Sequence, residues 1–227
     1  MDGTLLMALA LIPALIIAIV FHEVAHGWTA LMLGDPTAKE SKRLSLNPIR
    51  HVDPIGTVVV PGALALSGLP VFGWAKPVPV IKSRLNNPRF GMMAVAAAGP
   101  GTNLVLAAIG ALVLGFLAGQ GVQPDGASGF AAGALYSFIL INIFLALFNL
   151  LPIPPFDGSH IVEGLLPRGA ARAYDKLRPF GFPLLFLLLL VIPWFFPHWG
   201  IVERVVLPPV EWAASQFMAL AQWVADA

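Results

Sequence analysis

The sequence predicts an all-α, polytopic membrane protein with a single domain. Three observations predict this class: 58% of the 227 residues are hydrophobic, only 11% are charged, and several apolar stretches are long enough to cross a bilayer. Soluble domains carry roughly a quarter charged residues, so this chain lies well outside their range. We expect about four to six transmembrane helices and a re-entrant segment near residues 55–72. Residues 1–227 are expected to form one integral-membrane domain.

The remaining composition narrows the possible partners. The net charge is +1 and there is no run of basic residues, so nothing indicates nucleic-acid binding. Cysteine is absent, which excludes disulfides and thiolate metal sites. Any bound metal must therefore be held by histidine or carboxylate side chains. The first apolar stretch is too long for a signal peptide and no basic residue precedes it, so we expect it to be retained.

Four segments have the length and apolar character of membrane spans. They are residues 4–33, 91–118, 130–151 and 180–199. Residues 55–72 are also apolar but are interrupted by prolines and glycines. Residues 205–226 are a further candidate, which either crosses the membrane or lies at its interface.

The basic residues predict the orientation of these spans. They gather in three loops, which hold Lys39, Lys42, Arg43 and Arg50; Lys76, Lys82, Arg84 and Arg89; and Arg168, Arg172, Lys176 and Arg178. Loop 119–129 has no basic residue. By the positive-inside rule the three basic loops are cytoplasmic, which requires residues 55–72 to enter and leave on the same side. The β-prone run 56–60 inside this segment is interpreted either as hairpin packing or as an edge strand that pairs with an unwound substrate.

The first span contains the strongest chemical signal, the sequence His22-Glu23-Val24-Ala25-His26. Residues four apart lie on one face of a helix, about 6 Å apart along its axis, so His22 and His26 can bind one metal ion. Glu23 then flanks the metal as a general base. Ionisable side chains at membrane depth are costly and usually functional. The predicted topology places this group in the cytoplasmic half of the span.

A hydrolytic zinc site takes three protein ligands and leaves one position open, so a third ligand is needed. The two candidates are Asp157 and Glu40. Asp157 follows three prolines that stop the third span and carry the carboxylate to a fixed place. A carboxylate in so apolar a segment needs a cation, so Asp157 is preferred over Glu40.

The pairing of HEVAH with NLLPIPPFDG (149–158) resembles the site-2 proteases, the intramembrane zinc metalloproteases of peptidase family M50. The segments AAGPGTN (97–103), LNPIRHVDPIGT (46–57) and GWAKPVPV (73–80) resemble its compact prokaryotic branch, which lacks a PDZ domain. These motifs cover most of residues 20–165. The resemblance implies one Zn²⁺ per chain, bound by His22, His26 and Asp157, with Glu23 catalytic.

The resemblance also implies roles for residues outside the zinc site. Asn149 is expected to take part in catalysis, and Asn103 to hold substrate or reaction oxygens. Independently of the resemblance, Gly56 and Thr57 begin the β-prone run 56–60 and are candidate substrate contacts if this run pairs with substrate. The other histidines are interpreted as structural: His51 as a hydrogen-bonding loop residue, His160 as a poor candidate for a ligand, and His198 as an interfacial residue in an aromatic belt.

The function expected from these features is regulated proteolysis within the membrane. The partners are a membrane-protein substrate with a transmembrane segment and the lipid bilayer, and the location is a prokaryotic inner membrane with the active site toward the cytoplasm. Two alternatives remain: a membrane metal transporter and a non-catalytic metal-binding membrane protein. Oligomeric state cannot be derived from the sequence.

Overall fold

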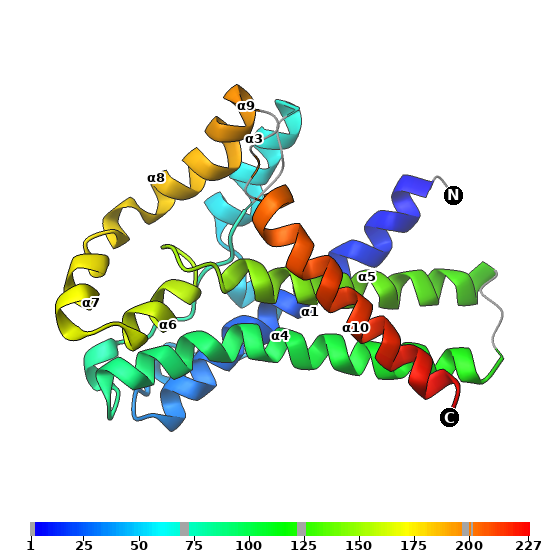
Figure 1. The fold of residues 1–227 in the computed structure, drawn as a ribbon, viewed down its shortest axis with the longest axis horizontal. Coiled ribbons are helices and arrows are strands. Elements are labelled where there is room, and N and C mark those ends of the chain that lie inside the picture. Colours follow the sequence, from blue (N-terminus) through cyan, green and yellow to red (C-terminus); the bar gives the residue numbers. More distant parts are fainter. Residues whose placement is uncertain (1–2, 69–72, 122–125, 197–199, 201) are drawn as a thin grey trace.

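The computed structural model describes residues 3–68, 73–121, 126–196, 200 and 202–227, and in these residues the chain is helical, with no strand (Figure 1). This confirms the all-α fold class. The helices are α1 (Gly3–Met32), α2 (Thr37–Glu40), η1 (Pro48–His51), η2 (Pro54–Val59), α3 (Val60–Leu66), η3 (Lys82–Arg84), α4 (Pro88–Gly119), α5 (Gly126–Asn149), α6 (Gly158–Leu165), α7 (Arg168–Asp175), η4 (Arg178–Phe180), α8 (Gly181–Phe186), η5 (Leu187–Val191), α9 (Ile192–Phe195), η6 (Val202–Val206) and α10 (Leu207–Ala225).

Four helical stretches of the described chain are long and apolar enough to cross a membrane, as predicted. They are Ala10–Met32, Pro88–Gly119, Gly126–Asn149 and Arg168–Phe195. The first three agree with the predicted spans. The fourth begins twelve residues before the predicted 180, because α7 to α9 follow one another with only a short turn after Asp175. Residues 197–199, which include His198, lie outside the described residues.

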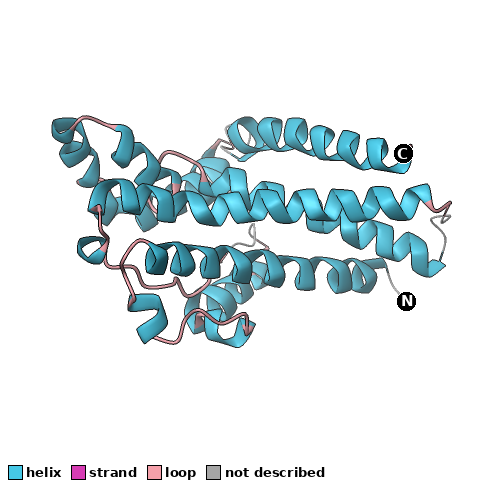
Figure 2. Cartoon of the chain, turned by 90° about the horizontal axis from the view of Figure 1, so that it is seen from below, coloured by secondary structure: helices cyan, strands magenta, loops and turns pink. Residues whose placement is uncertain are grey.

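Helices α1, α4, α5 and α10 form the packed part of the molecule. Figure 2 shows α10, α4 and α1 side by side along the long axis. Small residues permit this packing: a Cβ added at Gly115 of α4 would lie 2.2 Å from the carbonyl oxygen of Ala221 in α10. Residues 205–226, which were undecided between crossing and interfacial positions, therefore run along α4 as part of the bundle.

The segment after Asp53 corrects the prediction of a β-containing turn. The run 56–60 is helical, because the Asp53 carboxylate caps the amides of Ile55 and Gly56 (3.0 and 2.7 Å) and Pro54 occupies the first helical position. The chain then returns to its starting point, since the Trp74 amide donates to the Gly56 carbonyl at 3.1 Å. The out-and-back path is the one expected for a re-entrant segment. Residues 69–72 of the predicted range lie outside the described residues.

The return path continues through residues 73–81, which have no helical structure and run beside α1. The Ile81 amide donates to the carboxylate of Asp35, which is fully buried at the end of α1 (2.6 Å). Burial opposes ionisation of Asp35, but the hydrogen bonds from Thr37 and Ile81 outweigh it and lower its pKa. This contact fixes the extended segment against the helix that carries the histidines.

Candidate metal centre

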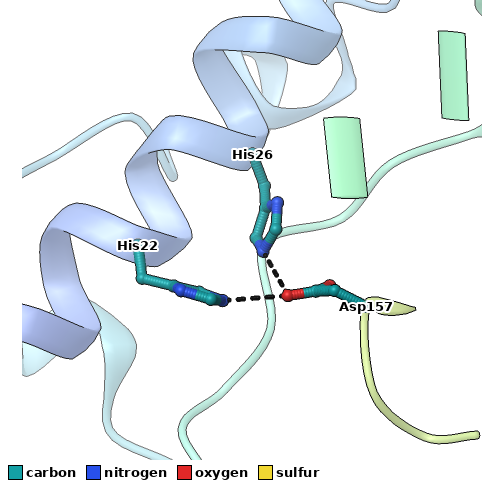
Figure 3. A group of neighbouring side chains, drawn as sticks. All are labelled: His22, His26 and Asp157. Carbon is teal, nitrogen blue, oxygen red and sulfur yellow. Dashed lines mark hydrogen bonds and ion pairs between the residues drawn. The ribbon is translucent and has the colours of Figure 1, made fainter. Parts of the chain in front are cut away.

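Three predicted side chains meet at the centre of the molecule (Figure 3). His22 and His26 project from one face of α1, and Asp157 approaches from the turn before α6. The Asp157 Oδ2 atom lies 3.1 Å from His22 Nε2 and 3.3 Å from His26 Nε2. All three ligand atoms lie within 4.8 Å of one another. The alternative ligand, Glu40, instead pairs with Arg84 at 2.7 Å on the exposed surface.

The first histidine is held by an amide in α4. His22 Nδ1 lies 2.6 Å from Asn103 Oδ1. The Asn103 amide nitrogen donates to the Ala18 carbonyl (3.1 Å) and to Asn142 Oδ1 (2.9 Å), so its oxygen end must face the imidazole. Nδ1 therefore carries the proton, and the lone pair of His22 lies on Nε2, toward Asp157.

The second histidine, His26, is held by the backbone of α4. His26 Nδ1 donates to the Val95 carbonyl at 2.7 Å, which leaves its lone pair on Nε2 as well. Gly99, one turn further along α4, provides the space for both rings. A Cβ at this position would lie 2.5 Å from His26 Nε2 and 2.6 Å from His22 Cε1.

Asp157 is held by a rigid turn and by the helix that follows it. Phe156 is buried against Phe148 of α5, with ring centroids 4.6 Å apart, and Gly158 packs so closely that a Cβ would lie 2.2 Å from the Leu150 carbonyl oxygen. The Arg89 side chain of α4 donates to the carbonyls of Gly164 and Leu166 at the end of α6. These contacts dock α6 on α4 and fix the position of Asp157, the residue that precedes α6.

The donor set fits a cation. With both Nδ1 atoms protonated, two imidazole lone pairs face one carboxylate oxygen at 3.1 and 3.3 Å. Such a group of acceptors is repulsive unless a positive charge lies among them. Two imidazoles and a carboxylate are the ligand types of catalytic zinc sites, which keep a further position open. The residues present therefore suit Zn²⁺.

Electrostatics agree with this assignment. Burial alone would raise the pKa of Asp157, but when protons in place of a metal occupy the two Nε2 atoms, their hydrogen bonds to Oδ2 outweigh burial and hold the pKa of this carboxyl well below its usual range. Asp157 is therefore ionised at neutral pH, which is the state that binds a metal.

Glu23 lies beside the centre and is oriented by the extended segment. Its Oε2 accepts a hydrogen bond from the Val78 amide at 2.8 Å. Val78 stands between Pro77 and Pro79, so it supplies the only amide hydrogen in that tripeptide. Among the described residues, Oε1 has no hydrogen-bond partner. The glutamate therefore has one oxygen held and one available for proton transfer.

The three candidate ligands and Glu23 all line a cavity of about 2050 Å³. Its walls are mostly apolar and come from α1, the re-entrant segment, α5, the fourth span and α10. Gly56 and Thr57 line the same cavity, as predicted for substrate contacts, although the Thr57 hydroxyl bonds to the Trp74 carbonyl at 3.0 Å. Asn149 also lines it, with its amide donating to the Leu145 carbonyl of its own helix (2.9 Å). The predicted roles of these three residues stay predictions.

Two other predicted residues are buried and held by hydrogen bonds, although His51 also lines the cavity. Asn103 is fully buried with its amide engaged by protein groups, so its placement indicates positioning of His22 rather than contact with substrate. His51 is buried and bonds the Ser45 carbonyl at 2.7 Å, consistent with a structural residue.

His160 lies outside the group formed by His22, His26 and Asp157; its ring nitrogens each lie 2.9 Å from the Arg178 guanidinium. Burial, and then the Arg178 charge, lower the pKa of His160 to about 4. Glu163, on the same helix, pairs with both Lys82 and Arg178. This ion-pair group joins α6 to η3 and to the start of the fourth span.

Sequence reasoning missed three parts of the site: Asn142, Gly99 and the Val78 amide. Asn142 had a signal, because a fully polar side chain in an apolar span needs a partner. Gly99 had none beyond its small size. The Val78 amide is a backbone group, for which the flanking prolines are the only sequence signal.

Comparison with known proteins identifies the family. The family model for peptidase family M50 matches residues 127–192. The chain is 39% identical over 198 residues to a Bacillus subtilis protein named "Putative zinc metalloprotease YwhC", covering 85% of this chain and 87% of that protein. It is 31% identical over 186 residues to "Putative zinc metalloprotease Rip2" of Mycolicibacterium smegmatis, covering 80% and 68%. No solved structure gives a significant match.

The helical membrane fold, the donor set and these relatives together define a zinc-dependent metalloprotease. The chain belongs to peptidase family M50, the family of the site-2 proteases, as its motifs predicted. The comparisons favour this class over the transporter and the non-catalytic alternatives.

Proposed function

We propose that the protein cleaves peptide bonds in or beside transmembrane segments of other membrane proteins. His22, His26 and Asp157 hold one zinc ion per chain in this proposal. Bound zinc supplies Lewis acidity, which makes water nucleophilic near neutral pH and polarises a peptide carbonyl. The observation that carries the proposal is that this ligand group and Glu23 line a large, mostly apolar cavity within a membrane protein.

Glu23 acts as the general base. Its Oε1 accepts the proton of the attacking water, while the hydrogen bond from the Val78 amide to Oε2 keeps the carboxylate oriented. The same oxygen then returns the proton to the leaving amine. Asn149, on the cavity wall, is the candidate donor to the developing oxyanion once its amide leaves the Leu145 carbonyl.

The substrate is a helix that must unwind locally, because a helical peptide bond has its carbonyl in a hydrogen bond. The apolar cavity walls suit side chains that come from lipid. The basic loops at residues 39–50, 76–89 and 168–178 support an orientation with the catalytic end toward the cytoplasm, in a prokaryotic inner membrane.

The test is cleavage of a single-span reporter protein in proteoliposomes. Wild type is compared with Glu23→Gln, which keeps the shape of the side chain and removes the base. We expect Glu23→Gln to lower turnover by about 10²–10⁴-fold and to retain zinc. In a separate comparison, replacing helix-breaking residues near the reporter's cleavage site with leucine should slow its cleavage by the wild-type enzyme.

Two results would contradict the proposal. Turnover that is unchanged in Glu23→Gln would exclude the glutamate as base. Zinc content that is unaffected by Asp157→Ala, measured by metal analysis of the purified protein, would exclude the ligand set.

A further inference from the structure

We propose that Asn142 is a positioning residue for zinc binding, which acts on His22 through Asn103. The inference rests on the proposed ligand set. It assigns a role to a side chain of α5 that contacts neither the metal ligands nor the cavity. Its basis is a chain of hydrogen bonds that runs from the backbone of α5 through two buried amides to the imidazole.

The donor-to-acceptor direction of these hydrogen bonds is fixed at the Phe138 carbonyl, the end furthest from His22. The Asn142 amide nitrogen donates to the Phe138 carbonyl one turn earlier in α5 (2.8 Å), so the Asn142 oxygen faces Asn103. Asn103 must then present its nitrogen to Asn142 and its oxygen to His22. A backbone carbonyl can only accept, so the whole chain has one allowed direction.

The reversed arrangement would prevent zinc binding by His22. A flipped Asn103 would offer an N–H group to Nδ1, which would move the imidazole proton to Nε2, the atom that faces the other ligands. The same flip would place the Asn103 oxygen against two acceptors, the Ala18 carbonyl and Asn142 Oδ1. Asn142 therefore contributes to the energy that keeps the metal-binding tautomer.

Burial makes this contribution necessary. Both asparagines are 0% exposed, so water cannot replace a lost partner without opening the helix interface. His26 needs no such device, because its Nδ1 bonds directly to the Val95 carbonyl, whose orientation the helix fixes. The two histidines thus differ: one is oriented by backbone, the other by side-chain amides that could rotate.

The experiment measures zinc affinity by competition with a chelator in detergent-solubilised, full-length protein. The variants are Asn142→Leu, Asn103→Leu and the double variant, with His22→Ala as reference. Ser137→Ala is the matched control, because Ser137 also lies on α5 and bonds only to the Gly133 carbonyl of its own helix (2.8 Å) at the exposed surface. The visible spectrum of the Co²⁺-loaded protein reports the ligand geometry.

We expect Asn142→Leu to weaken zinc binding by about 10–100-fold and to change the Co²⁺ spectrum, while Ser137→Ala changes neither. In the Asn103→Leu background, Asn142→Leu should have no further effect, because Asn142 acts only through Asn103. A general packing defect would instead lower affinity by the same factor in both backgrounds.

Unchanged affinity in Asn142→Leu, or equal effects in both backgrounds, would overturn the inference. Asn142→Ala, which leaves space instead of filling it, carries the same test should the leucine variant fail to fold. His22→Ala distinguishes a wrong ligand set from a wrong role for Asn142. If it leaves zinc affinity intact, the ligand set itself is wrong; if it abolishes binding while Asn142→Leu does not affect it, only the role of Asn142 is wrong.

Discussion

The two sides of the metal centre are built differently. On one side α1, α4 and α5 pack closely through small residues and buried amides, and they hold both histidines. On the other side the cavity is lined by the re-entrant segment and the fourth span, which project away from the bundle (Figure 1). In the most apolar windows of the first three spans, 33, 28 and 22% of the residues are buried, against 11% in the fourth.

Under the proposed function, this difference in packing matches two separate requirements of an enzyme that cleaves helical substrates. The metal ligands need fixed positions, which the packed side supplies. In the proposed function a helical substrate must enter past a wall that can move, and the fourth span, which has the smallest buried share, is the candidate for it. Asp157 lies between them, since α6 is docked on α4 by Arg89 and joined to the outer side by Glu163. Changes on the packed side should therefore affect zinc binding, and changes on the outer side should affect turnover or stability alone.

The largest effect is expected from Gly99→Ala on the packed side. The new methyl group would overlap both imidazoles, because its carbon would lie 2.5 and 2.6 Å from their nearest atoms, and α4 cannot retreat from α1 without losing its other contacts. We expect zinc affinity to fall by about 100-fold or more, since small displacements of site groups have effects of that size. Chelator competition measures it.

The control for this change lies two residues further along the same helix. Gly101 has nothing within 4 Å of an added Cβ, so Gly101→Ala should retain zinc and gain slightly in helix stability. Equal zinc affinity in the two alanine variants would show that the packed side can adjust to an added methyl group, and that it does not hold the metal ligands more rigidly than the outer side.

The next effect is expected from Val78→Pro in the extended segment 73–81, which connects the outer side to α1. This change removes the amide hydrogen that Glu23 Oε2 accepts, in a segment that already contains two prolines. Glu23 would lose its fixed orientation, so we expect turnover of a membrane reporter to fall by about 10–100-fold with zinc content unchanged. Val78→Ala keeps the amide and removes most of the side chain, so it should retain far more activity. Equal losses in the two variants would assign the effect to packing.

The sequence predicted the parts of this site that depend on local chemistry. The four-residue spacing of His22 and His26 and the proline-stopped turn at Asp157 need no knowledge of the remaining fold, and both are found as predicted. Three of the four spans also followed from hydropathy alone, because apolar length is itself the signal. The fourth began early, since the basic residues of α7 hid its helical start.

The features that were missed depend on one local cap and on tertiary contacts. Residues 56–60 have a β-prone composition, yet the Asp53 cap and Pro54 start a helix there, so local capping prevailed over intrinsic preference. Asn103 was expected near the substrate, but its depth depends on how α4 packs on α1 and α5. The pairing of Asn103 with Asn142 cannot be read from residues that lie 39 positions apart.

A smaller effect concerns acid stability at the junction between the two sides. The pKa of His160 is about 4 in the folded protein and about 6.5 when unfolded. Between these values the unfolded chain binds more protons, so stability falls as the pH is lowered from 6.5 to 4. The lowered pKa of Glu163, whose burial is outweighed by Lys82 and Arg178, adds a loss only at more acidic pH.

His160→Gln should remove the first of these losses, which is about 2 kcal/mol after allowance for partial exposure. The measurement is the thermal midpoint of the metal-free protein in detergent between pH 4 and 7, for wild type and variant. The variant should be less sensitive to acid over this interval. Parallel curves would show that the environment of His160 does not oppose its protonation.

The smallest effect is expected from Phe182→Leu, which tests the contact between the fourth span and Trp74. Phe182 packs edge-on against Trp74, which follows the re-entrant segment and bonds to Gly56 within it, with ring centroids 5.3 Å apart. Such pairs contribute about 0.5–1.5 kcal/mol, and leucine retains part of the apolar contact. We expect a loss of about 1 kcal/mol in stability and no change in zinc affinity, because both rings belong to the outer side. A fall in zinc affinity as large as that of Gly99→Ala would mean that the outer wall and the ligand scaffold form one rigid unit.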